Sequence, residues 1–262
     1  MKITILGSGS SSGVPIIGCD CSACKSHLQY NKRTRASALF ENNGTKLLVD
    51  TTPDLRIQAL RHNLSSVDGI LYTHFHSDHC DGISDLQPFV PTNELNTVHI
   101  YSDVMTLCSL VASNSYFFIR GIVSKWKKCH YLTPNIMYYY QEYDIGNFRI
   151  LMIKQDHGVA DCNGFIFNNQ VAYCTDVKSF PKKSFDLLYK IKVLILGCLK
   201  YEESFAHSSV NACLEWIAEL KPETTIFTHM SHDLEYYSFI DYIKSRIDDN
   251  VIVGYDGLQF VI

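Results

Sequence analysis

The sequence predicts an α+β fold with β-sheets inside and helices outside. Two patterns predict it: short runs of β-forming apolar residues recur along the chain, and helical periodicities follow the main groups of these runs. A hydrophobic content of 46% over 262 residues suffices to bury a large core. We expect a single domain over residues 1–262, because no linker, short repeat or low-complexity tract interrupts the chain.

Strands are expected where β-forming residues run between turn-forming ones. Each predicted strand is bounded by Gly, Asp, Asn or Ser, or by a change to polar residues. In chain order they are Ile3–Leu6, Ala38–Phe40, Lys46–Val49, Gly69–Tyr72, Val98–Tyr101, Phe148–Ile153, Gly164–Phe167, Val171–Tyr173, Val193–Leu196, Thr225–Phe227 and Val251–Val253.

Helices are expected where apolar residues recur at intervals of three and four. The first spans Leu55–Leu64. The second spans Val210–Leu220 and ends before Pro222, which cannot continue a helix. The third spans Tyr236–Ile247. Residues 114–141 are rich in Tyr, Lys and Phe, and their pattern predicts no definite element.

The charge balance and the cysteine content bear on location and partners. Asp and Glu outnumber Lys and Arg by 27 to 23, so the formal net charge is −4 and an extended nucleic-acid-binding surface is not expected. No apolar stretch approaches the roughly 20 residues of a membrane-spanning helix, and the apolar run after Met1 is too short for a secretory signal. The 10 cysteines then indicate reduced thiols and metal ligands, which predicts a cytoplasmic protein without a membrane partner.

A glycine-rich segment follows the first predicted strand. Its spacing from Gly7 to Gly13 is G-x-G-x-x-x-G, and Val14-Pro15 comes next instead of an amphipathic helix. A dinucleotide-binding loop requires G-x-G-x-x-G before such a helix, so that function is not expected. We interpret the segment as a tight turn whose N–H groups face an anionic ligand.

The strongest chemical signal is the motif His74-Phe75-His76-Ser77-Asp78-His79. Three imidazoles and one carboxylate occupy six positions directly after an apolar strand. Alternate residues at a strand end can point two imidazoles the same way, and the turn that follows can aim Asp78 and His79 at a second point nearby. Packing alone gives no reason to concentrate so many titratable groups, and this donor set suits Zn²⁺, Mn²⁺ or Fe.

Three further candidates follow strands downstream of the motif. His157 follows Phe148–Ile153, Asp176 follows Val171–Tyr173, and His229 follows Thr225–Phe227. Rigid scaffolds place ligands where such strands end and turns begin. We therefore expect the three side chains to complete a binuclear metal site.

A second group of ligands is Cys19, Cys21 and Cys24. C-x-C-x-x-C supplies three thiolates, one ligand short of a tetrahedral zinc site. His232 is the leading fourth ligand because it follows His229 by three residues. Such a site would be structural, since four protein ligands leave no position for water. The alternatives are a redox role, for which a thioredoxin-like context is lacking, and three cysteines with no shared function.

The order of these residues resembles the metallo-β-lactamase superfamily. An H-x-H-x-D-H motif is followed by a lone His, a lone Asp and a lone His, each after a strand, over essentially the whole chain. The resemblance implies a four-layer αβ/βα sandwich with two metal ions at one edge. The implied ligands are His74, His76 and His157 for one metal, Asp78, His79 and His229 for the other, and Asp176 between them. Asp50 matches a position that orients a ligand histidine.

The N-terminal motifs resemble a narrower group, the phosphoribosyl cyclic phosphodiesterases and their relatives. They are G-x-G-x-S-x-G-V-P from residue 7, G-C-x-C-x-x-C from residue 18 and R-x-R-x-S from residue 33. This resemblance implies a Cys₃His zinc site, a catalytic histidine at His207 and a homodimer. Arg33 and Arg35 would either position a phosphate or form salt bridges.

The predicted function is hydrolysis of a small cyclic or nucleotide phosphodiester by a hydroxide that bridges two divalent ions, Zn²⁺ or Mn²⁺. Asp176 would hold both ions, Asp78 would hold one, and His207 would stabilise charge or protonate the leaving alkoxide. One alternative is a tRNA 3′-processing-type ribonuclease, which needs a basic RNA-docking surface. Another is a non-catalytic metal-binding protein on the same scaffold, which the loss of a ligand would mark. No ligand is lost here.

Overall fold

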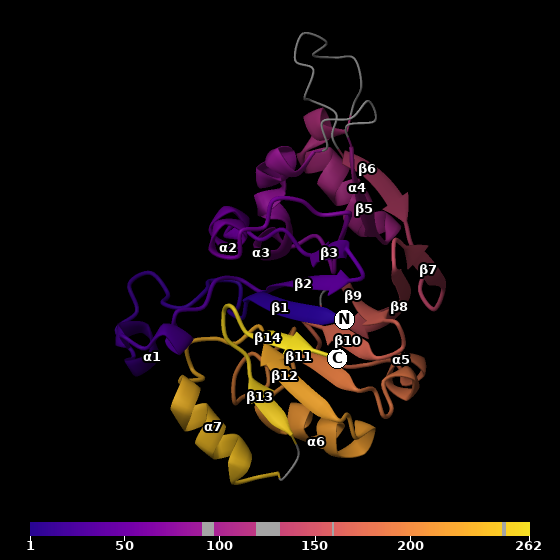
Figure 1. Ribbon diagram of the computed structural model, residues 1–262. Coiled ribbons are helices and arrows are strands. Elements are labelled where there is room, and N and C mark those ends of the chain that lie inside the picture. The colour runs from indigo at the N-terminus through magenta and orange to yellow at the C-terminus, as the bar shows by residue number, and fades with distance from the viewer. Residues whose placement is uncertain (91–96, 119–131, 159, 248–249) are drawn as a thin grey trace.

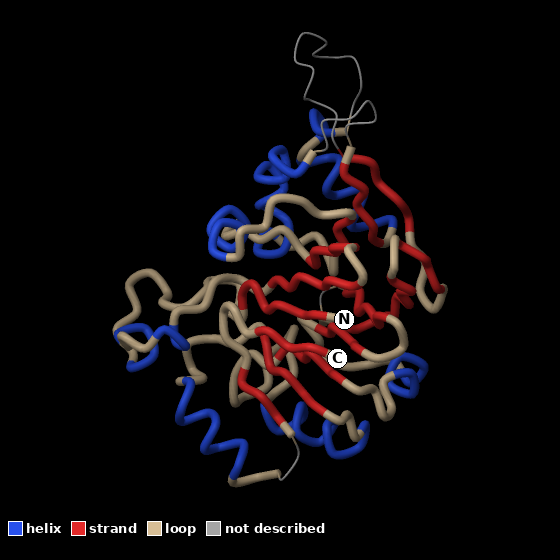
Figure 2. The backbone as a smooth tube through the Cα atoms, in the orientation of Figure 1, coloured by secondary structure: helices blue, strands red, loops and turns tan. Residues whose placement is uncertain are grey.

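The computed structural model describes residues 1–90, 97–118, 132–158, 160–247 and 250–262. Two seven-stranded sheets form its centre, and helices cover their outer faces (Figures 1 and 2). This arrangement is the predicted α+β sandwich of four layers. Among the described residues, no helix combines the length and the hydropathy that crossing a bilayer requires.

The first sheet has the strand order β14-β1-β2-β3-β4-β5-β6. Strands β3 to β6 run parallel, whereas β14, β1, β2 and β3 pair antiparallel. The bounds are β1 (Lys2–Gly7), β2 (Ser37–Asn42), β3 (Thr45–Val49), β4 (Gly69–Leu71), β5 (Val98–Ser102), β6 (Leu132–Ile136) and β14 (Gln259–Val261).

The second sheet has the order β13-β12-β11-β10-β9-β8-β7. Strands β10 to β13 run parallel, and β7 to β10 pair antiparallel. Since β8 and β10 are both antiparallel to β9, they point the same way. The bounds are β7 (Glu142–Ile145), β8 (Phe148–Asp156), β9 (Asp161–Phe167), β10 (Val171–Cys174), β11 (Val193–Gly197), β12 (Thr224–Thr228) and β13 (Val251–Val253).

The helices divide between the two outer faces, apart from the short α1 and η1 beside the N-terminal loop (Figure 1). Those of the N-terminal half are α1 (Ser22–Lys25), η1 (Gln29–Asn31), α2 (Leu55–Arg61), α3 (Ser77–Cys80), η2 (Asp81–Phe89), α4 (Val104–Ser113) and η3 (Ser115–Phe117). Those of the C-terminal half are α5 (Lys182–Leu187), α6 (Val210–Leu220) and α7 (Tyr236–Lys244).

Alternation along the strands separates the core between the sheets from the cores under the helices. In β3, Leu47 and Val49 face the second sheet, whereas Leu48 packs with the helices outside. Across the interior, the rings of Phe40 and Phe167 stack with centroids 3.9 Å apart. The sheets are therefore fixed to each other by apolar packing, and strand ends on both sheets keep a constant separation.

All the predicted strands are present, and the predicted helix Val210–Leu220 has those bounds in the structure. The predicted end of the first helix at Leu64 is wrong. It ends at Arg61 because Asn63 adopts the left-handed conformation (φ 51°) that terminates helices. The last helix ends at Lys244, earlier than predicted. Strands β6, β7 and β14 and helices α1, α3, α4 and α5 were not predicted. Within the segment 114–141, residues 119–131 lie outside the described residues.

Candidate metal centre

The candidate ligands gather at one edge of the sandwich because the strands that carry them end there. Asp50 follows β3, the His74–His79 motif follows β4, His157 follows β8, Asp176 follows β10, and His229 follows β12. Three of these strand-end residues have left-handed backbones: Asp50 (φ 63°), Asp176 (φ 52°) and His229 (φ 54°). Non-glycine residues adopt this conformation at a cost, and such strain often accompanies functional sites.

The first group consists of His74, His76 and His157. Nε2 of His74 lies 2.9 Å from Nδ1 of His76, which lies 3.3 Å from Nε2 of His157. One ligand atom from each residue lies within 4.8 Å of the others. Nitrogen donors this close, two of them buried, can share one metal ion.

The second group consists of Asp78, His79 and His229, and Asp176 lies between the two groups. Oδ2 of Asp78 is 3.2 Å from Nε2 of His79 and 3.6 Å from Nε2 of His229. Asp176 Oδ2 is 3.1 Å from His79 Nε2. Asp176 Oδ1 is 3.2 Å from His229 Nε2 and 3.9 Å from His157 Nε2. The Asp176 carboxylate thus reaches both groups.

Hydrogen bonds fix which nitrogen of the ligand histidines faces the centre. Nδ1 of His79 donates to Oδ2 of Asp50 at 2.7 Å, which leaves Nε2 as the free donor atom. Thr73 donates its hydroxyl proton to the same Asp50 oxygen, so its oxygen accepts from Nδ1 of His74 at 3.0 Å. Nδ1 of His157 donates to the Ala206 carbonyl at 2.9 Å. His74, His79 and His157 therefore present Nε2 inward, whereas His76 presents Nδ1.

The electrostatics suit cation binding. Burial alone would raise the pKa of Asp176, but His229 and His79 hold it well below its usual range. Asp78 behaves in the same way. Burial opposes its ionised form, whereas the nearby imidazoles of His229 and His79 favour it, so its pKa is lowered. Burial lowers the pKa of His74 well below its ordinary value, which keeps the imidazole neutral. Ionised carboxylates and a neutral His74 are the forms that metal ligands need. At His79, burial opposes protonation, but Asp176 and Asp50 raise its pKa well above its ordinary value.

Within the described part of the chain, buried nitrogen atoms of two ligand histidines are unpaired, which also fits the binding of two ions. The buried Nε2 atoms of His79 and His229 have no hydrogen-bond partner among the described residues. A buried polar atom without a partner costs free energy unless something binds it. Two ions held by imidazole and carboxylate would satisfy both atoms.

His207 lies beside this centre without belonging to either group of three. Its Nε2 is 3.9 Å from Asp176 Oδ1, and its ring stacks on His229 with centroids 5.2 Å apart. A turn holds it just before α6, because the His207 N–H donates to the hydroxyl of Ser204. Burial and then the neighbouring His229 lower the pKa of His207 to about 4.

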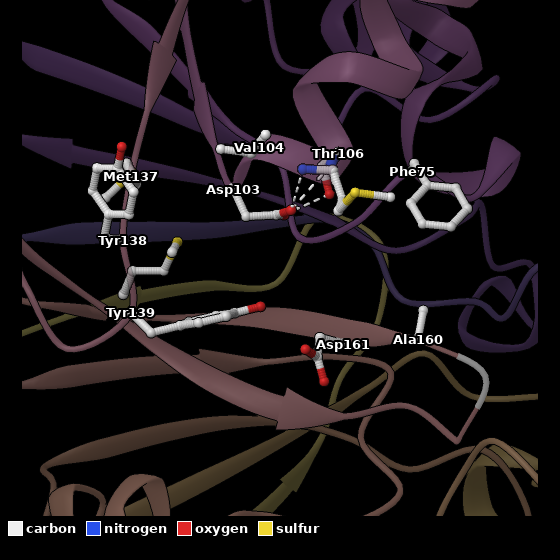
Figure 3. A pocket seen from close by; sticks show the side chains of 11 residues that line it. Phe75, Asp103, Val104, Thr106, Met137, Tyr138, Tyr139, Ala160 and Asp161 are labelled. Atoms are coloured by element: carbon white, nitrogen blue, oxygen red, sulfur yellow. Dashed lines mark hydrogen bonds between the residues drawn. The ribbon is translucent and has the colours of Figure 1, made fainter.

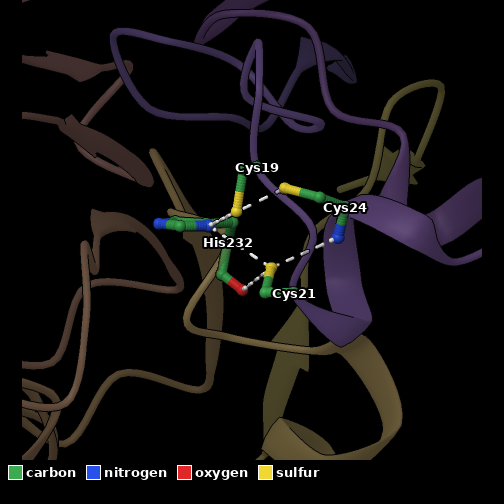
Figure 4. A group of neighbouring side chains, drawn as sticks. All are labelled: Cys19, Cys21, Cys24 and His232. Atoms are coloured by element: carbon green, nitrogen blue, oxygen red, sulfur yellow. Dashed lines mark hydrogen bonds between the residues drawn. The ribbon is translucent and has the colours of Figure 1, made fainter.

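The cysteine group forms a second, separate cluster (Figure 4). Nδ1 of His232 lies 3.2 Å from the sulfur of Cys19, 3.4 Å from that of Cys21 and 3.7 Å from that of Cys24. Backbone N–H groups support two of the sulfurs: Cys24 N–H donates to Cys21, and Ile16 N–H donates to Cys24. The hydrogen bond from Cys24 N–H is the largest influence that lowers the pKa of Cys21, to about 7. Three sulfurs around one imidazole nitrogen fit a tetrahedral zinc ion.

The chain is similar to known proteins in both sequence and structure. The beta-lactamase superfamily domain matches residues 45–230. A crystal structure described as a new diphosphatase from the PhnP family has a TM-score of 0.87 and 30% sequence identity, and the match covers 99% of this chain and 97% of that chain. The chain belongs to the metallo-β-lactamase superfamily, within the PhnP family.

Two other relatives differ in their sequence identity to this chain and in how much of their own length it covers. An octanoyltransferase of Porphyromonas gingivalis is 28% identical over 268 residues, which are 100% of this chain and 52% of that protein. The chain therefore spans about half the length of that curated relative. Zinc-bound PqqB from Methylobacterium extorquens has a TM-score of 0.78 at 16% identity, with 100% of both chains covered, and shares the metallo-β-lactamase fold.

Two predicted roles near this metallo-β-lactamase centre are not supported. Arg33 does not face the centre, because it is buried and donates to the carbonyls of Ser231 and Leu234. Arg35 forms a salt bridge with Asp54 at 3.1 Å, which was the predicted alternative to positioning a phosphate. Both arginines therefore stabilise loops next to the centre.

The glycine-rich turn is largely occupied by the protein's own acceptors. The N–H groups of Ser8, Gly9, Ser10 and Gly13 donate to acceptors within the chain. Four of the N–H groups that were expected to face an anion are thus already paired. Asp256 is one of the acceptors, and it joins the turn to Thr34.

Sequence reasoning missed Thr73 and Ala206, which orient His74 and His157. A threonine beside a histidine has no distinctive pattern, and a backbone carbonyl has none at all. The one available signal for Thr73 was its place directly before the motif, since residues adjacent to ligands often hydrogen-bond to them.

Proposed function

We propose that this protein is a binuclear metal-dependent phosphodiester hydrolase that acts on a small phosphodiester. The observation that carries the proposal is the position of Asp176. Its carboxylate lies 3.1 and 3.2 Å from His79 and His229 of one group and 3.9 Å from His157 of the other. A carboxylate shared by two groups of three ligands suits a pair of ions a few ångströms apart. Such pairs are common in enzymes that cleave phosphate esters.

The candidate ligands would hold two ions, and Asp50 would orient two of these ligands. His74, His76 and His157 would hold one ion, Asp78, His79 and His229 the other, and Asp176 both. Two divalent ions bound there would lower the pKa of a shared water and neutralise charge on the phosphate oxygens. Asp50 would keep His79 and, through Thr73, His74 in the orientation that presents Nε2.

His207 would act on the leaving group. It is the imidazole beside Asp176 that neither group of three requires, and it is partly open to solvent at 16% exposure. With a pKa near 4 in the absence of an anion, it is neutral at pH 7. An incoming phosphate would favour its protonated form, so that it could donate a proton to the departing alkoxide.

The names of relatives support phosphate chemistry and suggest one rival. The PhnP-family relative is described as a diphosphatase, so cleavage of a P–O–P linkage is the second candidate. The octanoyltransferase name belongs to a protein of which this chain matches about half, and it does not extend to the matched half by itself. The cysteine group would bind a structural zinc ion and not take part in the reaction.

The alternatives differ in what they require of this chain. A ribonuclease would need a basic surface for RNA, whereas the chain has a net charge of −4. A non-catalytic scaffold would be expected to lack a ligand, whereas all seven candidate ligands lie together. We also propose a cytoplasmic location for the enzyme, and homodimerisation stays a prediction.

The test combines metal content with turnover. Wild type, Asp176→Ala and the surface control Asp186→Ala would be assayed with bis-p-nitrophenyl phosphate, a cyclic nucleotide and a diphosphate ester. Asp186 pairs with Lys182 on the exposed face of α5 and touches no ligand. We expect about three metal ions per chain in wild type and in the control, and about one in Asp176→Ala, which would have no turnover.

Two outcomes would contradict the proposal. A wild type with a single zinc ion and no turnover would indicate a zinc-stabilised binding protein. Turnover of the diphosphate ester alone would replace the phosphodiesterase with a diphosphatase.

A further inference from the structure

A cavity of about 510 Å³ has a lining that includes neighbours of His74, His76 and His157 in the chain (Figure 3 shows the lining). Two of its lining residues adjoin the ligands. Phe75 stands between His74 and His76, and its ring centroid is 5.4 Å from that of His76. Ala160 accepts a hydrogen bond from the His157 N–H at 3.0 Å. The cavity therefore adjoins the segments that carry these three ligands.

The wall is rigid on one side. Asp103 caps α4 by accepting from the N–H groups of Met105 and Thr106. The same carboxylate accepts from the side chain of Asn163 at 2.7 Å, and the Asn163 N–H donates to the Thr73 carbonyl, next to the first ligand. The cavity is thus fixed relative to the metal ligands and belongs to the framework that positions them.

Aromatic and sulfur-containing side chains dominate the lining. Phe75, Tyr138 and Tyr139 supply rings, while Met105, Met137 and Met152 supply flexible thioethers. Met105 is 68% exposed and Tyr138 is 56% exposed, although both are large apolar residues. Aromatic rings stack well against flat ligands, and methionines adapt to their shape. A volume of this size is typical of a small-molecule site.

The charges of the cavity are negative or neutral. Asp103 and Asp161 lie in its wall, and among the described residues no Lys or Arg lines it. Lys154 pairs with Asp161 at 2.8 Å and offsets that charge. Among the described residues Asp103 forms no salt bridge, because its partners are neutral donors. A second phosphate or a carboxylate would therefore be disfavoured here.

One polar group faces the interior. The hydroxyl of Tyr139 points into the cavity between Asp103 and Asp161 (Figure 3), and none of the described residues forms a hydrogen bond with it. Burial raises the pKa of Tyr139 well above its ordinary value, so the hydroxyl stays protonated. It can donate to a ring nitrogen or carbonyl of a ligand.

We propose that this cavity binds an uncharged aromatic group carried by a phosphate ester whose phosphate lies at the metal centre. The inference rests on the proposed function and narrows it. The substrate would be an ester with one phosphate and an aromatic substituent, such as a nucleobase or an aryl group. A polynucleotide fits poorly, because the phosphates that flank each base would come close to Asp103.

The test keeps the leaving group constant and varies the other ester. Methyl, phenyl and 4-carboxyphenyl esters of 4-nitrophenyl phosphate all release 4-nitrophenolate. We expect kcat/KM to be about tenfold higher or more for the phenyl ester than for the methyl ester, because a ring leaves water. The 4-carboxyphenyl ester is expected to lose this advantage, because its charge would meet Asp103.

A positive charge introduced at the cavity mouth provides the decisive variant. Met105→Lys is expected to lower the preference for phenyl over methyl and to raise kcat/KM for the 4-carboxyphenyl ester above that for the phenyl ester. Leu60→Lys is the matched control, because Leu60 is 63% exposed on α2 and does not line the cavity. Ratios between substrates of one enzyme are independent of the fraction of active protein, so incomplete folding or metal loading does not affect them.

Binding measurements distinguish a failure of this inference from a failure of the proposed function. Calorimetry would compare phenyl phosphate with methyl phosphate on the metal-loaded wild type and on both variants. If phenyl phosphate binds about tenfold more tightly than methyl phosphate, and Met105→Lys loses this difference, the cavity is supported. If no diester is cleaved in that case, only the proposed function fails. Turnover of the methyl and phenyl esters at equal kcat/KM, with equal binding of the two phosphates, overturns the cavity and leaves the proposed function standing. If no ester is turned over and the two phosphates bind equally well, both the cavity and the proposed function are overturned.

Discussion

Oδ2 of Asp50 lies 2.7 Å from Nδ1 of His79, and both side chains are fully buried. The same carboxylate accepts from the N–H and the hydroxyl of Thr73, which in turn accepts from His74. One side chain therefore orients a ligand in each group of three. Burial raises the pKa of Asp50, whereas His79 and the hydrogen bonds from Thr73 favour its ionised form.

We expect Asp50→Asn to weaken metal binding by about 10-fold to 100-fold. The amide oxygen can still accept from His79, but the charge is gone, and the amide nitrogen cannot accept from Thr73. Competition with a chromogenic chelator would measure the affinity. Asp54→Asn is the control, because Asp54 also follows β3 but pairs with Arg35. Equal affinities in Asp50→Asn and wild type would show that Asp50 supports the fold and not the ligands.

His62 gives a prediction on the pH dependence of stability. Burial, and then the positive charge of Arg61, lower the pKa of His62 below its ordinary value of 6.5. Its buried Nε2 has no hydrogen-bond partner among the described residues. The neutral imidazole is therefore favoured in the folded state, whereas the unfolded chain takes up a proton as soon as the pH falls through about 6.5. The free energy of unfolding should decrease from there downward.

Urea unfolding at pH 7.5 and pH 5 would measure this decrease. In His62→Gln the loss on acidification should be smaller than in wild type, while the exposed His27→Gln should behave as wild type does. The same pH dependence in all three proteins would show that other groups govern acid stability.

The centre was predictable from sequence because its ligands obey a rule of sheet geometry. His157, Asp176 and His229 follow strands that end at one edge, and parallel strands bring distant residues together there. The local motif around His74 then needed only these partners. What escaped prediction depends on tertiary contact: whether Arg33 points at a phosphate or at two carbonyls is decided by the loop that packs over it.

The unpredicted elements have physical reasons of the same kind. Strand β6 contains Pro134 and buries only Leu132, because it lies at the edge of its sheet, where little apolar pattern is required. Helix α4 has three buried residues, Thr106, Leu107 and Leu110, and its outer apolar residues obscure the helical periodicity. Those outer residues include Met105 at the cavity mouth, so the irregular pattern coincides with the proposed binding surface.

The cysteine cluster gives a third prediction. Cys24→Ser should remove one zinc ion per chain and lower the melting temperature, because Cys24 is buried and its loop packs against the segment that follows His229. Cys108→Ser, on the exposed face of α4, is the matched control and should keep both properties. Since Arg33 holds Ser231 and Leu234 independently of the cysteines, the two ions of the active centre should remain. Loss of all metal from Cys24→Ser would mean that the two sites are not separable.

The contact between Gly197 and Asp176 gives the last prediction. A Cβ at Gly197 would lie 2.9 Å from the backbone nitrogen of Asp176 and 3.2 Å from Cα of Thr175. These are backbone atoms at the end of β10, so Asp176 itself must move. We expect Gly197→Ala to cost about 1–3 kcal/mol of stability and to weaken metal binding.

Gly44→Ala separates the two effects. Gly44 has φ +88°, and no atom lies within 4 Å of its Cβ position, so the substitution strains a distant turn without touching the centre. It should lower stability and leave metal affinity unchanged. If Gly197→Ala binds metal as tightly as Gly44→Ala does, then Asp176 tolerates a displacement of its backbone. A carboxylate that still reaches both groups of ligands after such a shift would be positioned by the ions and not by the strand that carries it.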